Sequence, residues 1–502
     1  MYPHHRTPVL YHTYAEGLCR PDVPTRDGAP PYDMVTRFDA TDRPLIRDLT
    51  LHPATILRVL GAFILILVTA PLFPASAGTP STVESKAAAL FKAGDYPEVL
   101  ALYRGLPPDA TPSREFLRLT LLSYVRLGRT DEALAIYGKL HQPEKPHDPS
   151  LLRPLSLGVI TSHVRDRKEH VRIAAYSALA ELGLPETAAV LEDGLLDTSV
   201  VVRARAVEAI GKAGLAAKSG ALRRALRDET ATVRIAAMTA LGEAQATDIQ
   251  QRLLDVARTE DGPEAIFACA ALFQMGRSEK LDDITSAATL PDAESRMAAL
   301  GVLGRLKRPS SLAVLAQAVY DPDPSVRAFA AGALGEFGSP GGVAPLTHAI
   351  GDEISMVRGV AAASLGKLGI KENRPLLMAL TRDPDPRVRA HAAEGLLRLG
   401  DTSAITLATE LARHSDPSIR GAAAQALSAS DHKEAMAVLH TLLQDQQPLP
   451  RLMAVKGLRR SGEGAIPILV KGLQDSDEAV RIAAASSLLQ QLTRFNSSKR
   501  LH

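Results

Sequence analysis

From residue 172 onward, apolar residues recur along this chain with a long and regular period. At steps of 31 residues, a Val-Arg dipeptide or a close variant is followed by Ala three positions later and by Leu or Ile seven positions later. Positions three and seven after a given residue share one face of a helix, so each step predicts a helix with an Ala/Leu face. The arginines of this series are Arg172, Arg203, Arg234, Arg296, Arg327, Arg358, Arg389, Arg420, Arg451 and Arg481; Ala265 holds the position between Arg234 and Arg296, and the last step is 30 residues.

The other half of each repeat predicts a second apolar helix. One example is the run from Ser311 to Val319, which ends at the turn Asp321-Pro322-Asp323-Pro324. Proline stops one helix there, and a polar side chain can cap the next. Neither helix can bury its apolar face alone, so neighbouring repeats must stack. We therefore expect an all-α fold, an α-solenoid built as a superhelical array of antiparallel helix pairs.

A different repeat precedes this array. The segment Gly94–Tyr103 recurs as Gly128–Tyr137 with an offset of 34 residues, and each copy combines a turn at Gly with an amphipathic helix. This pattern resembles two TPR motifs, whose period is 34 residues. We assign residues 78–142 to a TPR-like segment and the Pro-rich residues 143–154 to a linker.

The consensus of the longer array is Asp-x-Asp/Ser-x-x-Val-Arg-x-x-Ala-x-x-Ala-Leu-Gly. It resembles the HEAT repeat in the compact form found in phycobilisome-lyase-type bacterial proteins. The resemblance covers residues 155–493 as eleven repeats and leaves a polar tail at 494–502. It implies the fold strongly and the function weakly, because such arrays serve many tasks.

An aspartate stands six residues before the arginine in eight repeats. In HEAT proteins, similar Asp and Arg positions form a hydrogen-bonded ladder between adjacent layers, and charge-assisted pairs of this kind fix geometry. We favour this structural interpretation of the arginine series over the alternative, an anion-binding row. The aspartates are Asp166, Asp197, Asp228, Asp321, Asp352, Asp383, Asp445 and Asp475.

The N-terminal region has the pattern of an export signal. The apolar run Val59–Phe73 follows Arg58 and precedes Ala75-Ser76-Ala77, a small-x-small cleavage pattern. We expect a signal peptide at 54–77 with cleavage after Ala77, and a periplasmic or secreted protein. The alternative is a membrane anchor formed by residues 59–73. Residues 1–53 have the composition of disordered sequence, or precede the true translation start.

Composition and motifs argue against several functions. The chain has 58 Lys and Arg against 56 Asp and Glu, a balance that does not favour nucleic acid. Cys269 falls in an otherwise apolar column of the repeats, where a thiol packs as a small hydrophobe. HEAT-type di-iron hydroxylases carry His-Glu dipeptides, and this sequence has none. We therefore expect no catalytic residues, no cofactor and no metal.

The most irregular repeats span residues 246–308, where Thr259 and Leu290 replace the ladder Asp and Ala265 replaces Arg. In HEAT proteins, which the array resembles, the Val-Arg helices line the concave face. We predict that a protein partner of unknown identity docks there, near the residues Phe273, Gln274, Met275, Arg305 and Glu336. Two functions remain open: an exported interaction scaffold, or a lyase-like or enzyme-accessory protein that grips a cofactor-bearing or modified protein.

Overall fold

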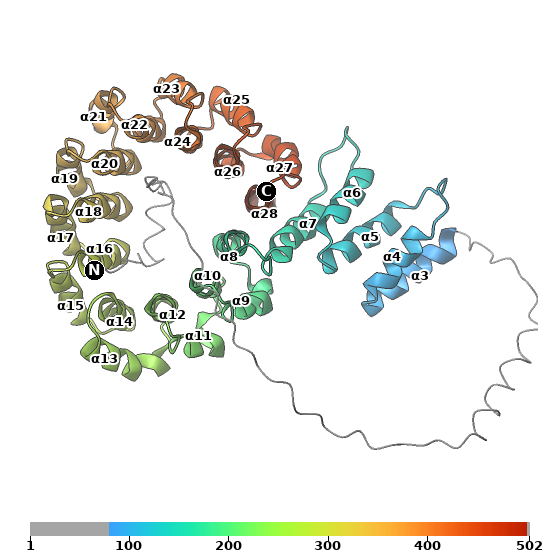
Figure 1. The fold of residues 1–502 in the computed structure, drawn as a ribbon, viewed down its shortest axis with the longest axis horizontal. Coiled ribbons are helices and arrows are strands. Elements are labelled where there is room, and N and C mark those ends of the chain that lie inside the picture. The colour runs from blue at the N-terminus through green and yellow to red at the C-terminus, as the bar shows by residue number, and fades with distance from the viewer. Residues whose placement is uncertain (1–79, 499–502) are drawn as a thin grey trace, which may run out of the picture. The chain divides into compact units, whose positions relative to one another are not determined.

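The computed structural model describes residues 80–498, and within them it contains helices and no strand (Figure 1). The predicted disordered segment, the signal peptide and the cleavage position after Ala77 lie outside the described residues. From Ala87 onward, the described residues belong to one compact unit. The prediction of an all-α solenoid is confirmed.

Four helices form the N-terminal part, in the segment predicted to be TPR-like. They are α3 (Pro80–Ala93), α4 (Tyr96–Arg104), α5 (Arg114–Arg126) and α6 (Thr130–Leu140). The side chain of Asp95 caps α4 by accepting a hydrogen bond from the Glu98 amide, and Ser113 caps α5 in the same way. Helix α5 packs against both α4 and α6.

The predicted linker is too long at its C-terminal end. Helix α7 (Pro149–Ser162) begins inside residues 143–154. The Asp148 side chain accepts a hydrogen bond from the Ser150 amide, and Pro149 occupies the first turn. Proline is tolerated at that position because the first amide of a helix has no helical partner. The motif Asp-Pro-Ser therefore starts a helix here.

The repeats that follow form two layers of helices, shown in Figure 1. The inner layer comprises the Val-Arg helices: α8 (Glu169–Leu182), α10 (Val200–Lys212), α12 (Ala231–Glu243), α14 (Pro263–Gln274), α16 (Ala293–Leu306), α18 (Pro324–Phe337), α20 (Ser355–Lys367), α22 (Pro386–Arg398), α24 (Pro417–Leu427), α26 (Pro448–Gly457) and α28 (Glu478–Ser498). Helix α28 thus continues into the range predicted as a polar tail.

The outer layer is made of shorter helices: α9 (Ala188–Gly194), α11 (Gly220–Ala225), α13 (Gln250–Thr259), α15 (Lys280–Ala287), α17 (Ser311–Gln317), α19 (Val343–Ala349), α21 (Arg374–Leu380), α23 (Ala404–Leu411), α25 (Lys433–Leu442) and α27 (Ile466–Gly472). Short 3-10 helices join or extend them at Pro185–Thr187, Ala216–Lys218, Thr247–Ile249, Ala318–Tyr320, Pro340–Gly342, Lys371–Asn373, Leu458–Arg460 and Glu463–Ala465.

Small side chains let the inner helices approach closely. Ala330 and Leu334, three and seven residues after Arg327, are fully buried. A Cβ atom on Gly366 would lie 2.3 Å from the Cα of Gly395 in the next helix, so α20 and α22 touch backbone to backbone there. The abundance of Ala and Gly in the sequence therefore has a direct packing cause.

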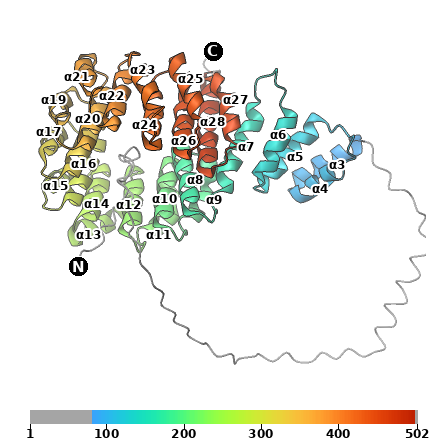
Figure 2. The ribbon, with the colours of Figure 1, turned by 45° about the horizontal axis from the view of Figure 1, so that its top comes forward.

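The array closes on itself. Each inner helix contacts the next, and the last one, α28, contacts both α8 and α7. Figures 1 and 2 agree that α28 lies beside α7, although more than 300 residues of chain separate the two ends of the array. Lys168 Nζ lies 2.8 Å from Glu478 Oε1 across this contact. We call the contact of α28 with α7 and α8 the closing joint, and the space inside the inner helices the lumen.

Candidate functional site

The arginine series joins each repeat to the next. In Arg358, Nε and Nη2 donate to the two carboxylate oxygens of Asp383 at 2.7 and 2.9 Å. Its Nη1 donates to the backbone carbonyl of Asp352, in its own repeat, at 2.9 Å. The arginine thus makes a bidentate contact to the aspartate of the next repeat, and its third nitrogen donates to a backbone carbonyl of its own repeat. The ion pair therefore joins the arginine of one repeat to the aspartate of the next repeat, and not to the aspartate of its own repeat.

Seven pairs of this kind recur along the array. They are Arg172–Asp197, Arg203–Asp228, Arg296–Asp321, Arg327–Asp352, Arg358–Asp383, Arg420–Asp445 and Arg451–Asp475. Burial alone raises the pKa of Asp352, yet hydrogen bonds from Arg327 and from the Ile354 amide outweigh burial and leave that pKa lowered. The guanidinium nitrogens point at protein acceptors, an arrangement that supports the structural interpretation of the series over anion binding.

Four positions depart from this geometry. Arg234 pairs with Glu264 instead of an aspartate, because Thr259 holds the usual carboxylate position. Arg389 donates to the carbonyls of Asp383 and Pro384, and His414 stands where the next carboxylate would be. Arg481, on the last inner helix, pairs with Asp131 of α6. Asp166 caps the Lys168 amide rather than pairing with an arginine of the series.

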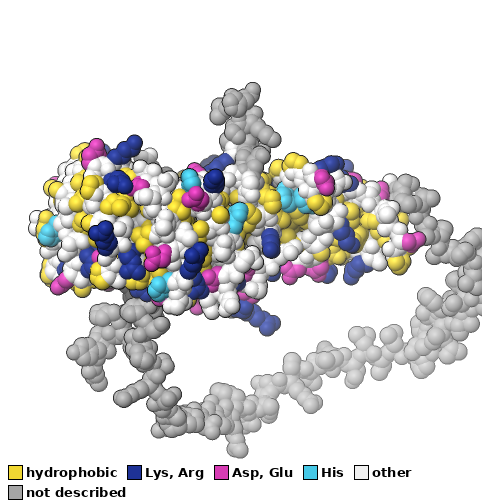
Figure 3. All heavy atoms as spheres, turned by 90° about the horizontal axis from the view of Figure 1, so that it is seen from above, with side chains coloured by type: hydrophobic (Ala, Val, Ile, Leu, Met, Phe, Trp, Pro, Cys, Tyr) yellow, Lys and Arg dark blue, Asp and Glu magenta, His cyan; other side chains and the backbone are white. Residues whose placement is uncertain are grey.

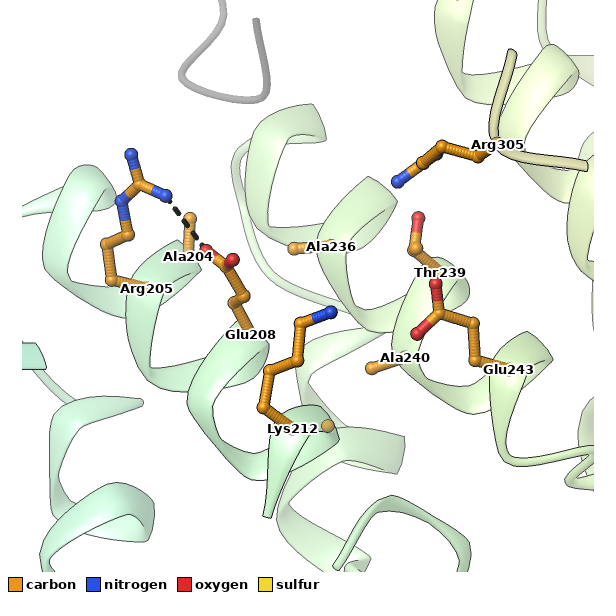
Figure 4. Close-up of a pocket in the computed structure, with 10 residues that line it drawn as sticks. Ala204, Arg205, Glu208, Lys212, Ala236, Thr239, Ala240, Glu243 and Arg305 are labelled. Carbon is orange, nitrogen blue, oxygen red and sulfur yellow. Dashed lines mark hydrogen bonds and ion pairs between the residues drawn. The ribbon is translucent and has the colours of Figure 1, made fainter. Parts of the chain in front are cut away.

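A first cavity, of about 110 Å³, opens on the inner side of α10 and α12 (Figure 4). The side chains of Lys212 and Arg305 point into it from different helices, and Glu243 and Thr239 face them from α12. Arg205 and Glu208 form an ion pair at its edge, with 2.8 Å between Nη1 and Oε2. The guanidinium of Arg305 also lies 5.6 Å from the ring centre of Phe267.

A second cavity, of about 500 Å³, reaches across the lumen. Glu336, Lys367 and Arg398 border it from α18, α20 and α22, and Glu181 borders it from α8. Lys367 Nζ lies 2.5 Å from Glu336 Oε1. Each of these four residues stands nine positions after the arginine of its own repeat. Side chains at this place in the repeat therefore face the lumen.

Glu394 is the most unusual ionisable group on this face. Its side chain is only 4% exposed, and Oε1 accepts hydrogen bonds from Arg398 Nε and Nη2 at 3.1 and 2.8 Å. Gln425 Nε2 donates to Oε2 at 3.3 Å, and His391 Nδ1 lies 3.7 Å from the same oxygen. Burial raises the pKa of Glu394, but His391 and Arg398 outweigh burial and lower that pKa to about 2.

The residues predicted to bind a partner do not form one exposed apolar spot. Phe273 and Met275 are both half-buried; Arg308 lies 5.1 Å from the ring centre of Phe273, and Met275 packs against the core. The Gln274 carbonyl accepts a hydrogen bond from Gln245 Nε2. Arg305 and Glu336 are exposed and border the two separate cavities. The structure therefore distributes the predicted set along the lumen.

Sequence reasoning missed a further polar set on the inner face: Arg205, Glu208, His391, Glu394 and Gln425. These residues stand two or five positions after the arginine of their own repeat. At the same two places, most other repeats have apolar, small or hydroxyl side chains. A charged or amide side chain at a place where most repeats have a small or apolar one is the signal that could have identified these residues.

Several other groups have structural roles. Cys269 is buried, and burial raises the pKa of its thiol to about 11. His141 and His147 stack with ring centres 4.0 Å apart. Among residues 80–498, no group of three or more His, Cys, Asp or Glu is placed to hold a metal ion. The same residues include no helix that is both long and apolar enough to cross a membrane.

On one face of the molecule, acidic and basic side chains are intermingled with apolar ones, and no large area of a single charge stands out (Figure 3). This view agrees with the near-zero formal charge of +2.

Comparisons with known proteins address the fold. The sequence profile of HEAT repeats matches residues 152–211, 315–383, 373–459 and 436–492. No curated protein matches the chain. Among solved structures, the complex of CpcE and CpcF of phycocyanin lyase from Nostoc sp. PCC7120 is similar, with 19% identity, a TM-score of 0.34, and coverage of 48% of this chain and 94% of that one. Human deoxyhypusine hydroxylase in complex with glycerol is similar at 18% identity and a TM-score of 0.25, with coverage of 55% of this chain and 96% of that one. At these identities the likeness concerns the fold alone. Over the matched residues, the chain is built of HEAT repeats.

Proposed function

We propose that this protein is an exported interaction scaffold or adaptor that binds a protein partner on the inner face of its HEAT array and performs no catalysis of its own. The single observation that carries the proposal is the continuous row of polar side chains along the lumen. Glu181, Lys212, Glu243, Arg305, Glu336, Lys367 and Arg398 all border its cavities. Long charged side chains of both signs on one face suit a protein surface with its own mixed charge.

The TPR-like segment supports the same role. Helices α5 and α6 pack against α7, which in turn packs against α28, so this segment is attached at the closing joint. Asp131 of α6 also supplies the carboxylate for Arg481, the last arginine of the series. A partner bound to the TPR-like helices would therefore act next to the place where the array closes.

Export belongs to the proposal as well. The apolar run Val59–Phe73 and the Ala75-x-Ala77 pattern support a cleaved signal peptide and a periplasmic location. N-terminal sequencing of the protein recovered from its native envelope should begin at Gly78. A recovered protein that retains residues 59–73 would instead be a membrane-anchored scaffold.

Site-specific photo-cross-linking tests the binding face. A photoreactive amino acid at Lys367 places the probe in the lumen, and one at Arg382, an exposed residue between α21 and α22, gives a matched control outside it. We expect a partner protein cross-linked at 367 and none at 382 in native envelope. Equal capture at both positions, or capture at 382 alone, would contradict docking on the inner face.

A further inference from the structure

The width of the lumen restricts what can enter it. Within residues 80–498, eleven inner helices from α8 to α28 form a closed circuit of contacts. Packed helices lie about 8–10 Å apart, so the circuit measures roughly 100 Å and the distance across it between helix axes is about 30 Å. Each helix with its side chains has a radius of about 5–6 Å, which leaves a lumen on the order of 20 Å wide.

The cavity geometry agrees with this narrow lumen. Glu181 on α8 and Glu336 on α18 border the same cavity, although these helices are five positions apart in the circuit of inner helices. A folded domain of about 100 residues has a radius of gyration of about 13 Å and is wider than the lumen. A single α-helix, about 10–12 Å across, or an extended strand of polypeptide fits.

The free charges of the lumen favour acidic groups. Three ion pairs neutralise part of its surface: Arg205–Glu208, Lys367–Glu336 and Arg398–Glu394. In the described structure, no carboxylate pairs with Lys212 or Arg305 in the first cavity, or with Lys456 and Arg459 beside the second. Only Glu181 and Glu243 oppose these four cations among the lining residues without an ion pair. The excess is basic.

From this width and charge, we infer that the lumen takes one acidic segment of a partner protein, as a single helix or an extended chain, and excludes a folded domain. This inference rests on the proposed function and names the partner's chemistry. Lys456 and Arg459, together with Lys212 and Arg305, bind its carboxylates, while Glu181 and Glu243 set where basic residues of the segment can lie.

A nucleic-acid strand fits these observations less well. Phosphate backbones need an electropositive path without acidic interruptions, and single strands bind largely by stacking on aromatic side chains. Neither cavity is lined by Phe or Tyr, and Glu181 and Glu243 would lie against the phosphates. We therefore assign the lumen to polypeptide.

Fluorescence anisotropy with synthetic peptides tests the charge. The probes are a labelled peptide of alternating Glu and Ala, its Lys and Ala counterpart, and a labelled oligothymidylate, each titrated with the full chain. The lumen variant Lys456→Glu/Arg459→Glu should bind the acidic peptide at least tenfold more weakly than the unmodified chain. The matched control Arg382→Glu/Arg413→Glu makes the same charge change at exposed residues outside the cavities and should stay within twofold.

Equal weakening in both variants would overturn the inference, because it would show a general charge effect. Tighter binding of the basic peptide would also overturn it, as would oligothymidylate binding that the lumen variant abolishes. If photo-cross-linking still places a partner at position 367 in any of these cases, the proposed function stands and only the acidic segment is wrong.

A size test addresses the width independently. Lys168→Cys/Glu478→Cys in a Cys19→Ser background, joined by a short bismaleimide, locks the closing joint; the remaining Cys269 is buried. The locked chain should bind an acidic peptide with a folded domain at one end. It should fail to bind the same peptide when both ends carry folded domains. Undiminished binding of the doubly flanked peptide would show that binding occurs outside the lumen.

Discussion

Two parts of the same array are held together in different ways. Between α18, α20 and α22, the joints are the buried pairs Arg327–Asp352 and Arg358–Asp383, whose side chains are at most 15% exposed. The ion pair of the closing joint is Lys168–Glu478, and beside it Arg481 of α28 pairs with Asp131 of α6; Lys168 and Asp131 are 55% and 74% exposed. Exposed pairs contribute less than buried bidentate pairs whose remaining atoms are also hydrogen-bonded.

The arginines show a similar contrast. Buried side-chain atoms without a hydrogen-bond partner occur in both regions of the described structure: Ser156 Oγ and Gln491 Oε1 belong to α7 and α28, and Ser295 Oγ, Ser311 Oγ and Ser418 Oγ belong to other repeats. Arg481 Nε, in α28, is also buried without a partner. The regular joints satisfy their arginines instead with a carboxylate and with backbone carbonyls. Two cavities, of about 410 and 200 Å³, also lie along the closing joint. The closing joint is therefore weaker than the joints between α18, α20 and α22, and we expect it to open before they do.

The largest expected effect is in the regular part. Asp383→Ala leaves the Arg358 guanidinium in a largely buried place without its carboxylate, so it should destabilise the protein by about 3–5 kcal/mol. Because repeats couple to their neighbours, hydrogen exchange should rise mainly in α20 and α22. The matched variant Asp131→Ala, beside the closing joint, should cost about 1 kcal/mol or less. Similar losses in both variants would erase the contrast between the two regions.

A pH effect of intermediate size should come from Glu394. Its folded pKa of about 2 lies below the ordinary value of 4.5, so the stability it contributes is present above pH 4.5 and is lost as pH falls toward 2. That contribution is on the order of 3 kcal/mol. Urea unfolding at a series of pH values should show a shallower decline between pH 4.5 and 2 for Glu394→Gln. Parallel pH profiles for the two proteins would show that this carboxylate is not held ionised.

The smallest effect should come from a hydroxyl at the closing joint. Ser156 and Ser123 are both fully buried, but only Ser123 Oγ donates a hydrogen bond, to the Leu119 carbonyl at 2.8 Å. Ser156→Ala should therefore change the free energy of unfolding by about 0.5 kcal/mol or less, whereas Ser123→Ala should cost about 1 kcal/mol. A loss at Ser156 as large as that at Ser123 would mean that its hydroxyl has a partner in solution.

Much of the fold could be predicted from local sequence signals. The 31-residue period, the Ala three positions after each arginine and the Asp-Pro turns specify helix pairs and their stacking, because these contacts join near neighbours. The linker prediction for residues 143–154 misses the start of α7, although Asp148 and Pro149 carry a capping signal.

Closure could not be predicted in the same way. It depends on a small rotation between repeats, summed over the whole array, and no single residue encodes that sum. The lumen residues were predicted in part. Arg305 and Glu336, which stand nine positions after the arginines of their repeats, were predicted. Glu394 and His391 were missed because most other repeats have small or apolar residues at the same places.

Zero-length cross-linking with a carbodiimide tests closure most directly, because it joins only amines and carboxylates already in contact. Lys168 and Glu478 lie 2.8 Å apart across the closing joint, and Lys367 and Glu336 lie 2.5 Å apart within the regular part. In monomeric protein, mass spectrometry should recover both cross-linked peptide pairs, and Glu478→Gln should remove only the first. Recovery of the Lys367–Glu336 link alone, or of the Lys168–Glu478 link only in covalent dimers, would contradict a closed array.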